Sequence, residues 1–555
     1  MATTVLHGKG KSAIDKSHKY DRQLRLWGDH GQASLESAKV CLINATAVGT
    51  EVLKNLILPG IGSFTIVDGG KVTGEDIGNN FFLCKNSIGK SRAQVATEYL
   101  AELNEDVDGH SVEESADVLL ATDPSFFSSF SMVIATNLCE KVLLQLSAVL
   151  WKDEVPLLVC RSYGFLGYMR LAIKDHTVVE SHPDNALEDL RLDQPFHDLE
   201  QFCDSLDLDS MTKKEHSHTP WLVLIYKYLQ QWKAQHQGLP PQNYAQKREL
   251  KEEIRKGIHK NEEGVPEDEE NFEEAILHLN SALVHTQIPP EVKKLLEHES
   301  CNNLHSESKP FWILVKALKD FTENEGQGQL PLRGTIPDMT ADSERYIQLQ
   351  NVYRKQAAKD VASVTRHVQK TLKELGKAKL LPPDIDLTTT NLCSISEQDI
   401  KTFCRNAAFL RMIHCSSIAE EYNKETMKLR EIANHLEDED CDDLVFYVLI
   451  RGVDKFYEEY NRYPGWYNGQ VETDIPLMKT CVSRLLHDWG LNASIKDDFI
   501  HEMCRYGAAE LHTVSAFIGG AAAQEIIKVL TTQFLPINNT FIYNAMKQTS
   551  LTVEL

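Results

Sequence analysis

Short apolar runs alternate with helical patterns between residues 38 and 175. Four of these runs are rich in β-branched residues and have the length of strands: KVCLIN, SFTIVD, SMVIAT and PLLVCRS. The strands of a parallel sheet are covered on both faces, so they read as continuous rather than alternating apolar runs. Helical patterns such as KSRAQVATEYLAELN fall between them. This order predicts the α/β class, with a doubly wound, Rossmann-like sheet.

The pattern becomes mostly helical near residue 180 and stays helical to about residue 490. The loops of this stretch are acidic, as in PEDEENFEEA and EDEDCDDL, and such runs are typical of solvated surface. After residue 490 a small-residue helical pattern, IGGAAAQEIIK, and strand-like runs return. We therefore expect an α/β domain in two parts, residues 1–180 and 491–555, interrupted by a long helical insertion at 181–490.

The net charge and the cysteines of the chain limit which partners and which cellular compartment we expect for it. The chain has 555 residues and a formal net charge of −23 at pH 7, which argues against a nucleic-acid partner because such proteins present a basic surface. Its twelve cysteines form no C-x-x-C pair, so we expect reduced thiols, a cytoplasmic or nuclear location and no metal site. The start of the chain lacks the apolar core of a secretion signal.

One stretch comes near the composition of a membrane span. VSAFIGGAAAQEIIKVL is apolar but is interrupted by Gln524 and Glu525. A membrane-spanning helix needs about twenty predominantly apolar residues. We therefore expect no transmembrane segment, and any attachment to membranes would be peripheral, through a protein partner.

The segment CLINATAVGT, residues 41–50, has the outline of a nucleotide-binding turn without its glycines. In the pattern G-x-G-x-x-G the three glycine positions here hold Asn44, Thr46 and Gly49. Glycines at this turn let backbone N–H groups approach a phosphate. Asn44 and Thr46 place side chains where phosphate oxygens would lie, and threonine is stiff at its first side-chain torsion. These residues alone leave both an ordinary βαβ unit and a degraded nucleotide site open.

Several segments together resemble the ubiquitin-like-modifier activating enzymes, and the resemblance covers nearly the whole chain. They are YDRQLRLWG (20–28), the strand, turn and helix at 40–58, YGFLGYMR (163–170) and GGAAAQEIIK (519–528). The resemblance implies an adenylation domain of the MoeB/ThiF type. In this family two homologous adenylation domains form a pseudo-symmetric pair of which only one is active.

The chain resembles the inactive half of such a pair. The family's D-x-D reads Asp68 and then Gly70, and Thr136 and Asn137 stand where a metal-binding aspartate is expected. No cysteine has the P-x-C-T setting of the family's thioester cysteine, so residues 181–490 would be a catalytic-cysteine-type half domain without its cysteine. The resemblance thus implies a chain that is not catalytic alone and binds no cofactor or metal, with ATP and Mg on its partner.

The resemblance also implies a heterodimer and its reaction. A catalytic subunit adenylates the C-terminal glycine of a ubiquitin-like modifier, forms a thioester with it and passes it to a conjugating enzyme. Segments such as ESHPDNALEDLRLDQPF and VPEDEENFEEAI resemble the branch of the family that serves neddylation, and the SUMO branch stays as an alternative. Contact with the cytoplasmic tail of the amyloid precursor protein is a further partner that the neddylation branch suggests.

Arg22 is the candidate for a direct part in the chemistry. At 100° per residue, Tyr20, Leu24 and Trp27 fall on one face of a helix, and Arg22 and Arg25 fall on the opposite face. In the family, the first arginine of Y-D-R-Q reaches across the pair to the partner's ATP phosphates, and Arg22 matches that position. An arginine there would neutralise phosphate charge in trans.

We also predict a partner interface on the helical insertion. It consists of His218 and of the segment after Pro337, whose alternative role is ordinary packing within the insertion. The residues of that segment are Asp338, Met339, Thr340, Ala341, Asp342, Ser343, Glu344, Arg345, Tyr346, Ile347, Gln348, Leu349, Gln350 and Asn351.

Three other functions compete with a regulatory subunit. A free-standing adenylating enzyme and a nicotinamide-dependent oxidoreductase both need the missing glycines, although Asp68 alone could mimic a ribose-binding acid. An adaptor protein that joins no enzyme complex needs none of these residues, and it stays the principal alternative.

Overall fold

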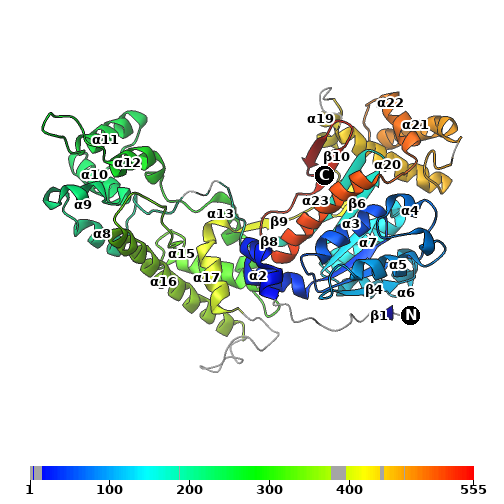
Figure 1. The fold of residues 1–555 in the computed structure, drawn as a ribbon, viewed down its shortest axis with the longest axis horizontal. Coiled ribbons are helices and arrows are strands. Elements are labelled where there is room, and N and C mark those ends of the chain that lie inside the picture. The colour runs from blue at the N-terminus through cyan, green and yellow to red at the C-terminus, as the bar shows by residue number, and fades with distance from the viewer. Residues whose placement is uncertain are drawn as a thin grey trace. The chain divides into compact units, whose positions relative to one another are not determined.

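The computed structural model divides the chain into two compact units. The first contains Met1–Val178 and Met412–Leu555, and the second contains Val179–Arg411 (Figure 1). The first boundary lies close to the expected one, whereas the second lies between residues 411 and 412 rather than near 490. The structure describes residues 4–5, 16–184, 186, 188–376, 395–437, 443–467 and 469–555.

A nine-stranded sheet forms the centre of the first unit, in the order β1-β4-β3-β2-β5-β6-β7-β10-β11. Strands β4, β3, β2, β5 and β6 are parallel, whereas β1 at one edge and β7, β10 and β11 at the other are antiparallel to their neighbours. The predicted Rossmann-like α/β fold is confirmed, with an antiparallel edge added. The bounds are β1 Thr4–Val5, β2 Lys39–Ile43, β3 Ser63–Val67, β4 Asp108–Val112, β5 Met132–Thr136, β6 Leu157–Tyr163, β7 Leu166–Ala172, β10 Thr540–Asn544 and β11 Thr549–Val553.

Helices cover both faces of this sheet because successive residues of a strand point to opposite sides. Leu42 and Phe64 belong to a core shared with α3, α5 and α23, whereas Cys41 and Val67 belong to a core shared with α6 and α7. The apolar runs seen in the sequence therefore serve two cores at once. The helices are α3 Ala47–Ile57, α5 Arg92–Ala101, α6 Ala116–Thr122, α7 Glu140–Lys152 and α23 His512–Thr531.

Helix α23 is the described helix whose length and composition would permit it to cross a membrane. More than half of its apolar window is buried within the protein, and it packs on α3. A Cβ atom added to Gly519 would lie 2.6 Å from the Cβ of Glu51, so only glycine permits this approach. With Glu525 also buried at 8% exposure, α23 is packed as a core helix of the α/β unit.

The segment after residue 412 belongs to the α/β unit because it packs on the antiparallel edge of the sheet. Two ion pairs fasten it there: Arg170 Nε lies 2.5 Å from Glu421 Oε2, and Arg161 Nη1 lies 2.7 Å from Asp454 Oδ1. All four side chains are at most 9% exposed. An arginine buried in a strand requires a carboxylate, and here the helices supply it. Glu421 belongs to α18 (Ile418–Tyr422) and Asp454 to α20 (Asp443–Tyr460), and the same segment continues with α21 Val471–Asp488 and α22 Asp497–Tyr506.

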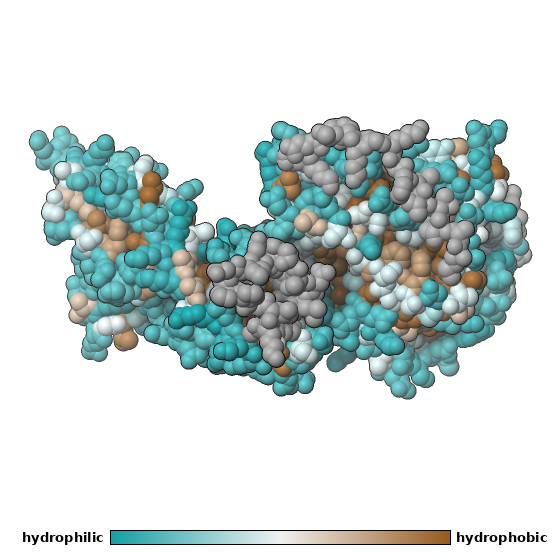
Figure 2. All heavy atoms as spheres, turned by 90° about the horizontal axis from the view of Figure 1, so that it is seen from below, coloured by the Kyte–Doolittle hydropathy of each residue, from teal (hydrophilic) through white to brown (hydrophobic). Residues whose placement is uncertain are grey.

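The second unit is helical, as the sequence indicates. Its core includes most of α10, from Trp221 to Leu229, together with Phe272 and Tyr353. The main helices are α8 His197–Asp204, α9 Lys213–Ser217, α10 Trp221–Gln235, α11 Tyr244–Lys256, α12 Glu270–Ala282, α15 Pro310–Glu323, α16 Ser343–Glu374 and α17 Glu397–Arg405. In Figure 2 hydrophilic residues cover most of the visible face, in keeping with the acidic loops.

Candidate functional site

The turn between β2 and α3 is closed by the side chains that replace two glycines. Asn44 adopts a left-handed backbone conformation with φ of 64°, which asparagine tolerates, and its Nδ2 donates to the carbonyl oxygen of Thr136 at 2.7 Å. Thr46 caps α3 by accepting from Gly49 N at 3.2 Å, and its hydroxyl lies 3.0 Å from that of Thr136. Both replacements therefore hold the turn against the end of β5.

Gly49 remains for a reason unrelated to phosphate. A Cβ atom at this position would lie 2.8 Å from Leu42 Cδ1 and 3.1 Å from the carbonyl oxygen of Asn44. The third glycine of such turns permits close packing of the helix on the strand. The close packing of α3 on β2 therefore accounts for Gly49 without any role in phosphate binding.

Glu510 occupies the position at the start of α3 that an anion would take. Ala47 N donates to Glu510 Oε2 at 2.9 Å, and Val48 N lies 3.5 Å from Glu510 Oε1. The first N–H groups of a helix have no partner within the helix and attract negative charge. Burial raises the pKa of Glu510 to about 7, although the two N–H groups act in the opposite direction. A carboxylate of the chain itself thus replaces a nucleotide phosphate.

Asp68, the acid that the D-x-D position retains, is also fully engaged. It is 2% exposed, and Arg92 donates to both of its oxygens, from Nε at 2.6 Å and from Nη2 at 3.2 Å. Ala45 N and Gly70 N donate to the same carboxylate at 2.8 and 2.7 Å. Arg92 contacts Asp76 as well, at 3.1 Å. The carboxylate that could have contacted a ribose or a metal instead stabilises the loop after β3.

Most of the described cysteines lack the access and the lowered pKa that a nucleophile needs. Eight of them are buried, and Cys84 and Cys139 are partly exposed. Burial raises the pKa of Cys404 to about 12 and also raises the pKa of Cys415 and of Cys481. Cys84 differs, because hydrogen bonds from Ser87 and Tyr99 lower its pKa to about 7. Cys393 lies outside the described residues.

Arg22 projects from the start of helix α2 (Asp21–Ser37) into solvent. Its side chain is 92% exposed, and its nearest carboxylate oxygen, on Asp21, is 3.9 Å away. Arg25 pairs with the same carboxylate at 3.0 Å, and Tyr20 is buried at 3% exposure. The aromatic residue therefore anchors this helix and the arginines point outward, as the helical spacing indicates.

The predicted interface segment and His218 lie together in the second unit. Asp342 N donates to the carbonyl oxygen of His218 at 3.0 Å, and the Asp342 side chain caps α16 by accepting from Arg345 N at 2.9 Å. Part of the segment packs inward: Leu349 is 0% exposed, and Arg345 donates to the carbonyl oxygen of Glu215 at 2.9 Å. The residues left on the surface are Asp338, Ser343, Glu344, Ile347, Gln348 and Asn351.

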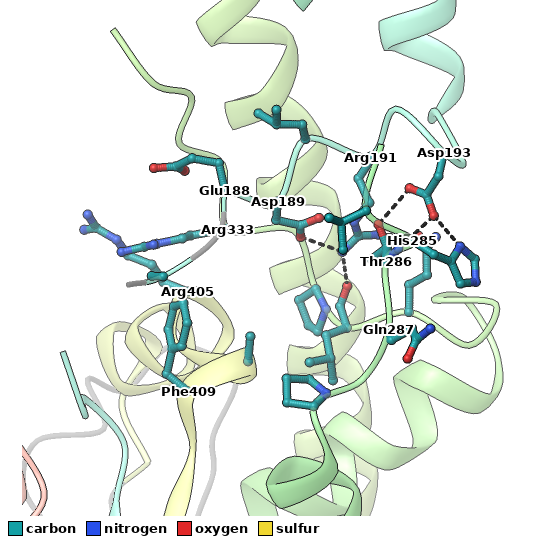
Figure 3. A pocket seen from close by; sticks show the side chains of 18 of the residues that line it. Glu188, Asp189, Arg191, Asp193, His285, Thr286, Gln287, Arg333, Arg405 and Phe409 are labelled. Atoms are coloured by element: carbon teal, nitrogen blue, oxygen red, sulfur yellow. Dashed lines mark hydrogen bonds and ion pairs between the residues drawn. The ribbon is translucent and has the colours of Figure 1, made fainter. Parts of the chain in front are cut away.

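The second unit also contains a cavity of about 550 Å³ (Figure 3). Several of its charged groups are paired with one another. Arg191 donates to both oxygens of Asp189, at 2.6 and 2.9 Å, and Asp193 accepts from Thr286 and contacts His285 Nδ1 at 2.7 Å. These contacts stabilise the loops around the cavity, and we assign no ligand to it.

Comparisons with known proteins identify the family of the chain. Residues 20–555 match the model of the ThiF family. The "NEDD8-activating enzyme E1 regulatory subunit" of Danio rerio is 56% identical over 540 residues, which cover 97% of this chain and 99% of the relative. The Drosophila melanogaster protein of that name is 47% identical over 550 residues, 99% of each chain. A structure of Escherichia coli MccB with ATP aligns over 28% of this chain and 50% of its own, at 14% identity and a TM-score of 0.26.

Proposed function

The chain belongs to the ThiF family, and we propose that it is the regulatory subunit of a heterodimeric NEDD8-activating enzyme. Relatives that bear this name cover nearly the whole chain. The observation that carries the proposal is the state of the turn at α3. Glu510 occupies the helix N-terminus and Arg92 engages Asp68, so this unit keeps the adenylation fold without a place for ATP.

In the proposed complex a catalytic subunit does the chemistry. It binds ATP and Mg, adenylates the C-terminal glycine of the modifier, and holds the modifier as a thioester before transfer to a conjugating enzyme. The present chain supplies the second adenylation fold of the pseudo-symmetric pair. Retention of buried β2, β3 and β5 beside a filled phosphate position fits selection for the fold rather than for nucleotide binding.

Arg22 is proposed to act across the interface of this pair. Its guanidinium is exposed and separated from its nearest carboxylate by 3.9 Å, so little desolvation or ion-pair energy opposes its transfer to a phosphate. Arginine suits this role because it stays charged and presents a planar set of donors. Charge supplied where the transition state becomes negative lowers the barrier to adenylation.

The surface part of Asp338–Asn351 and the adjoining His218 loop are proposed to contact the catalytic subunit. Ile347 is 53% exposed at the start of α16, so its apolar side chain is accessible to a partner that packs on this segment. The cytoplasmic tail of the amyloid precursor protein stays a further proposed partner, and a cytoplasmic or nuclear location stays a proposal.

Co-purification with the catalytic subunit tests the proposed function directly. The full chain, expressed with and without that subunit, is assayed by calorimetry for ATP binding and by gel shift for the modifier thioester. We expect no ATP binding by the chain alone, and one ATP and a NEDD8 thioester per heterodimer. ATP binding by the isolated chain, or failure to form an equimolar complex, would overturn the proposal. A thioester with SUMO instead of NEDD8 would favour the alternative branch, and an intact chain that binds only unrelated proteins would favour an adaptor.

A further inference from the structure

Two histidines and a glutamate converge in the second unit, away from the degraded nucleotide site. His216 Nδ1 lies 2.7 Å from Glu269 Oε1, and His259 Nδ1 lies 3.2 Å from the same oxygen. One potential ligand atom from each residue lies within 4.8 Å of the other two. His216 comes from α9, His259 follows α11, and Glu269 is the N-cap of α12. Three separate elements therefore direct electron-pair donors to one point.

The charge of Glu269 has few other partners. Its side chain is 2% exposed, and within the described ranges its ion-pair contacts are the two imidazoles alone. Its second oxygen accepts from the backbone N–H of His259 at 3.0 Å. A buried carboxylate is costly unless a cation or several donors compensate it. The cluster thus contains a buried negative charge faced by two imidazoles, each of which can bind either a proton or a metal ion.

We propose that His216, His259 and Glu269 form a binding site for a divalent zinc ion. Zinc binds imidazole nitrogen and carboxylate oxygen at about 2.0–2.2 Å, so two such ligands in a tetrahedral site are about 3.3 Å apart. The present spacing of 3.2 Å between His259 and Glu269 is close to that value, and the hydrogen bond of 2.7 Å between His216 and Glu269 would lengthen by about 0.6 Å when its proton gives way to the ion. Two imidazoles select against calcium and magnesium, which require oxygen ligands.

Solvent completes the coordination. The His259 side chain is 44% exposed, whereas His216 is 7% exposed, so water reaches the cluster from the His259 side. Three protein ligands and one water give zinc its usual four-coordinate geometry. The ring of His216 stacks on Phe272, with 4.9 Å between centroids, and this packing fixes one ligand before the metal arrives.

The bound ion would stabilise the loop that carries His218. Asn271 Nδ2 donates to the carbonyl oxygens of His216 and Thr219 at 2.8 and 2.9 Å, which ties α12 to the two ends of this loop. The loop in turn accepts from Asp342 N at the start of α16. The ion would join α9, the segment after α11 and the start of α12, and would keep one coordination position for water.

Zinc binding by the full-length chain tests the site. Untagged protein is stripped with a chelator, checked by circular dichroism and titrated calorimetrically with zinc chloride, with calcium and magnesium chlorides as comparisons. We expect one zinc ion per chain, no calcium or magnesium binding, and a rise in Tm with zinc. His259→Ala should weaken zinc binding by at least about 10- to 100-fold, the loss that even outer-sphere substitutions cause. His259 is chosen because its exposure makes misfolding of the variant less of a concern.

Two further variants separate coordination from general stability. Glu269→Gln keeps the size of the side chain and should also weaken zinc binding, whereas His278→Ala should leave it unchanged. His278 stacks on Trp221 in the same unit, with centroids 4.9 Å apart, and is not a member of the cluster. Cobalt(II) in place of zinc should give the visible absorption of a tetrahedral site. Absence of zinc binding by the folded chain, or equal affinity in wild type, His259→Ala and Glu269→Gln, would overturn the proposal and leave a hydrogen-bonded His–Glu–His cluster.

Discussion

Glu510 accepts a hydrogen bond from the backbone N–H of Ala47, a residue 463 positions earlier in the chain, at 2.9 Å. The contact joins the segment that precedes the helical unit to the segment that follows it. It also places a carboxyl group at the N-terminus of α3, where a free anion would otherwise be favoured. A residue of the chain itself therefore occupies the position of a nucleotide phosphate, in addition to the loss of two of the three glycines.

The raised pKa of Glu510 predicts a dependence of stability on pH. Its folded-state value of about 7 lies above the ordinary value of 4.5, so between these pH values the folded protein holds a proton that the unfolded chain has lost. Stability contributed through this group should therefore fall as pH rises from 4.5 to 7 and stay level above 7. One pKa unit corresponds to about 1.4 kcal/mol. The free energy of unfolding contributed through Glu510 should therefore fall by roughly 3 kcal/mol across this pH range.

Glu510→Gln should remove this dependence. The comparison is the Tm of wild type and variant across pH 4.5 to 8, with Glu502→Gln as the control, because Glu502 is a partly exposed carboxylate of α22 that pairs with Arg505 and has a lowered pKa. As the pH rises from 4.5 to 7, the Tm of wild type should fall relative to the Tm of Glu510→Gln. Parallel profiles for the two proteins would show that the carboxylate ionises normally in the fold.

Restoring the glycines should not restore a nucleotide site. In the double variant Asn44→Gly/Thr46→Gly, Glu510 still occupies the start of α3 and Arg92 still engages Asp68. We expect no ATP binding by calorimetry, and a loss of only a few tenths of a kcal/mol of stability from the helix cap, because glycine is itself an acceptable N-cap residue. Tight ATP binding by this variant would mean that the two side chains alone had closed the site.

Arg22→Ala should slow adenylation by the heterodimer without affecting the fold. Loss of a single charge-stabilising donor typically reduces kcat by about 10²–10³-fold, and the 92% exposed side chain contributes little to stability. The measurement is ATP–pyrophosphate exchange by the complex. Arg25→Ala is the matched control, because Arg25 lies on the same helix and pairs with Asp21. Equal rates for the two variants would remove Arg22 from the proposed mechanism.

Ile347→Glu should weaken the heterodimer. A charge placed at a buried apolar contact is costly, so we expect the Kd for the catalytic subunit to rise by at least about 10-fold, equivalent to about 1.4 kcal/mol. Leu277→Glu, at an exposed apolar position of α12 (72% exposed), is the control. Tyr346→Ala is less specific because Tyr346 also packs on the core of the second unit. An unchanged Kd for Ile347→Glu would leave the segment with a packing role alone.

The sequence predicts the strands whose burial is visible in composition. β2, β3, β5 and β6 are continuous apolar runs and were expected, whereas β4, DGHSV, is polar and was not. The second unit boundary differs for a related reason. The chain is mostly helical on both sides of residue 412, so the pattern does not reveal that the later helices pack on the sheet through a shared apolar core and through the pairing of Arg170 with Glu421 and of Arg161 with Asp454.

The site residues that could not be predicted from the sequence are far along the chain from the residues that they contact. Asn44, Thr46 and Asp68 could be selected because they stand in a recognisable turn. Glu510 lies far along the chain in YGAAELH and has no local signal that relates it to α3. Similarly, His216 and Glu269 are 53 residues apart, so they do not form a short sequence motif of the kind that predicts a metal site. Only folding brings these groups within hydrogen-bonding distance.

The pairing of β10 with β7 has a consequence for synthesis on the ribosome. Strand β7 is complete by Ala172, but its partner β10 begins at Thr540, and α23, which covers α3, is made just before it. Until then the nascent chain exposes an unpaired strand edge and an uncovered apolar layer, both of which favour aggregation. A premature stop after residue 500 would therefore leave an early-made domain permanently unfinished, and such truncated chains should depend on chaperones or be degraded.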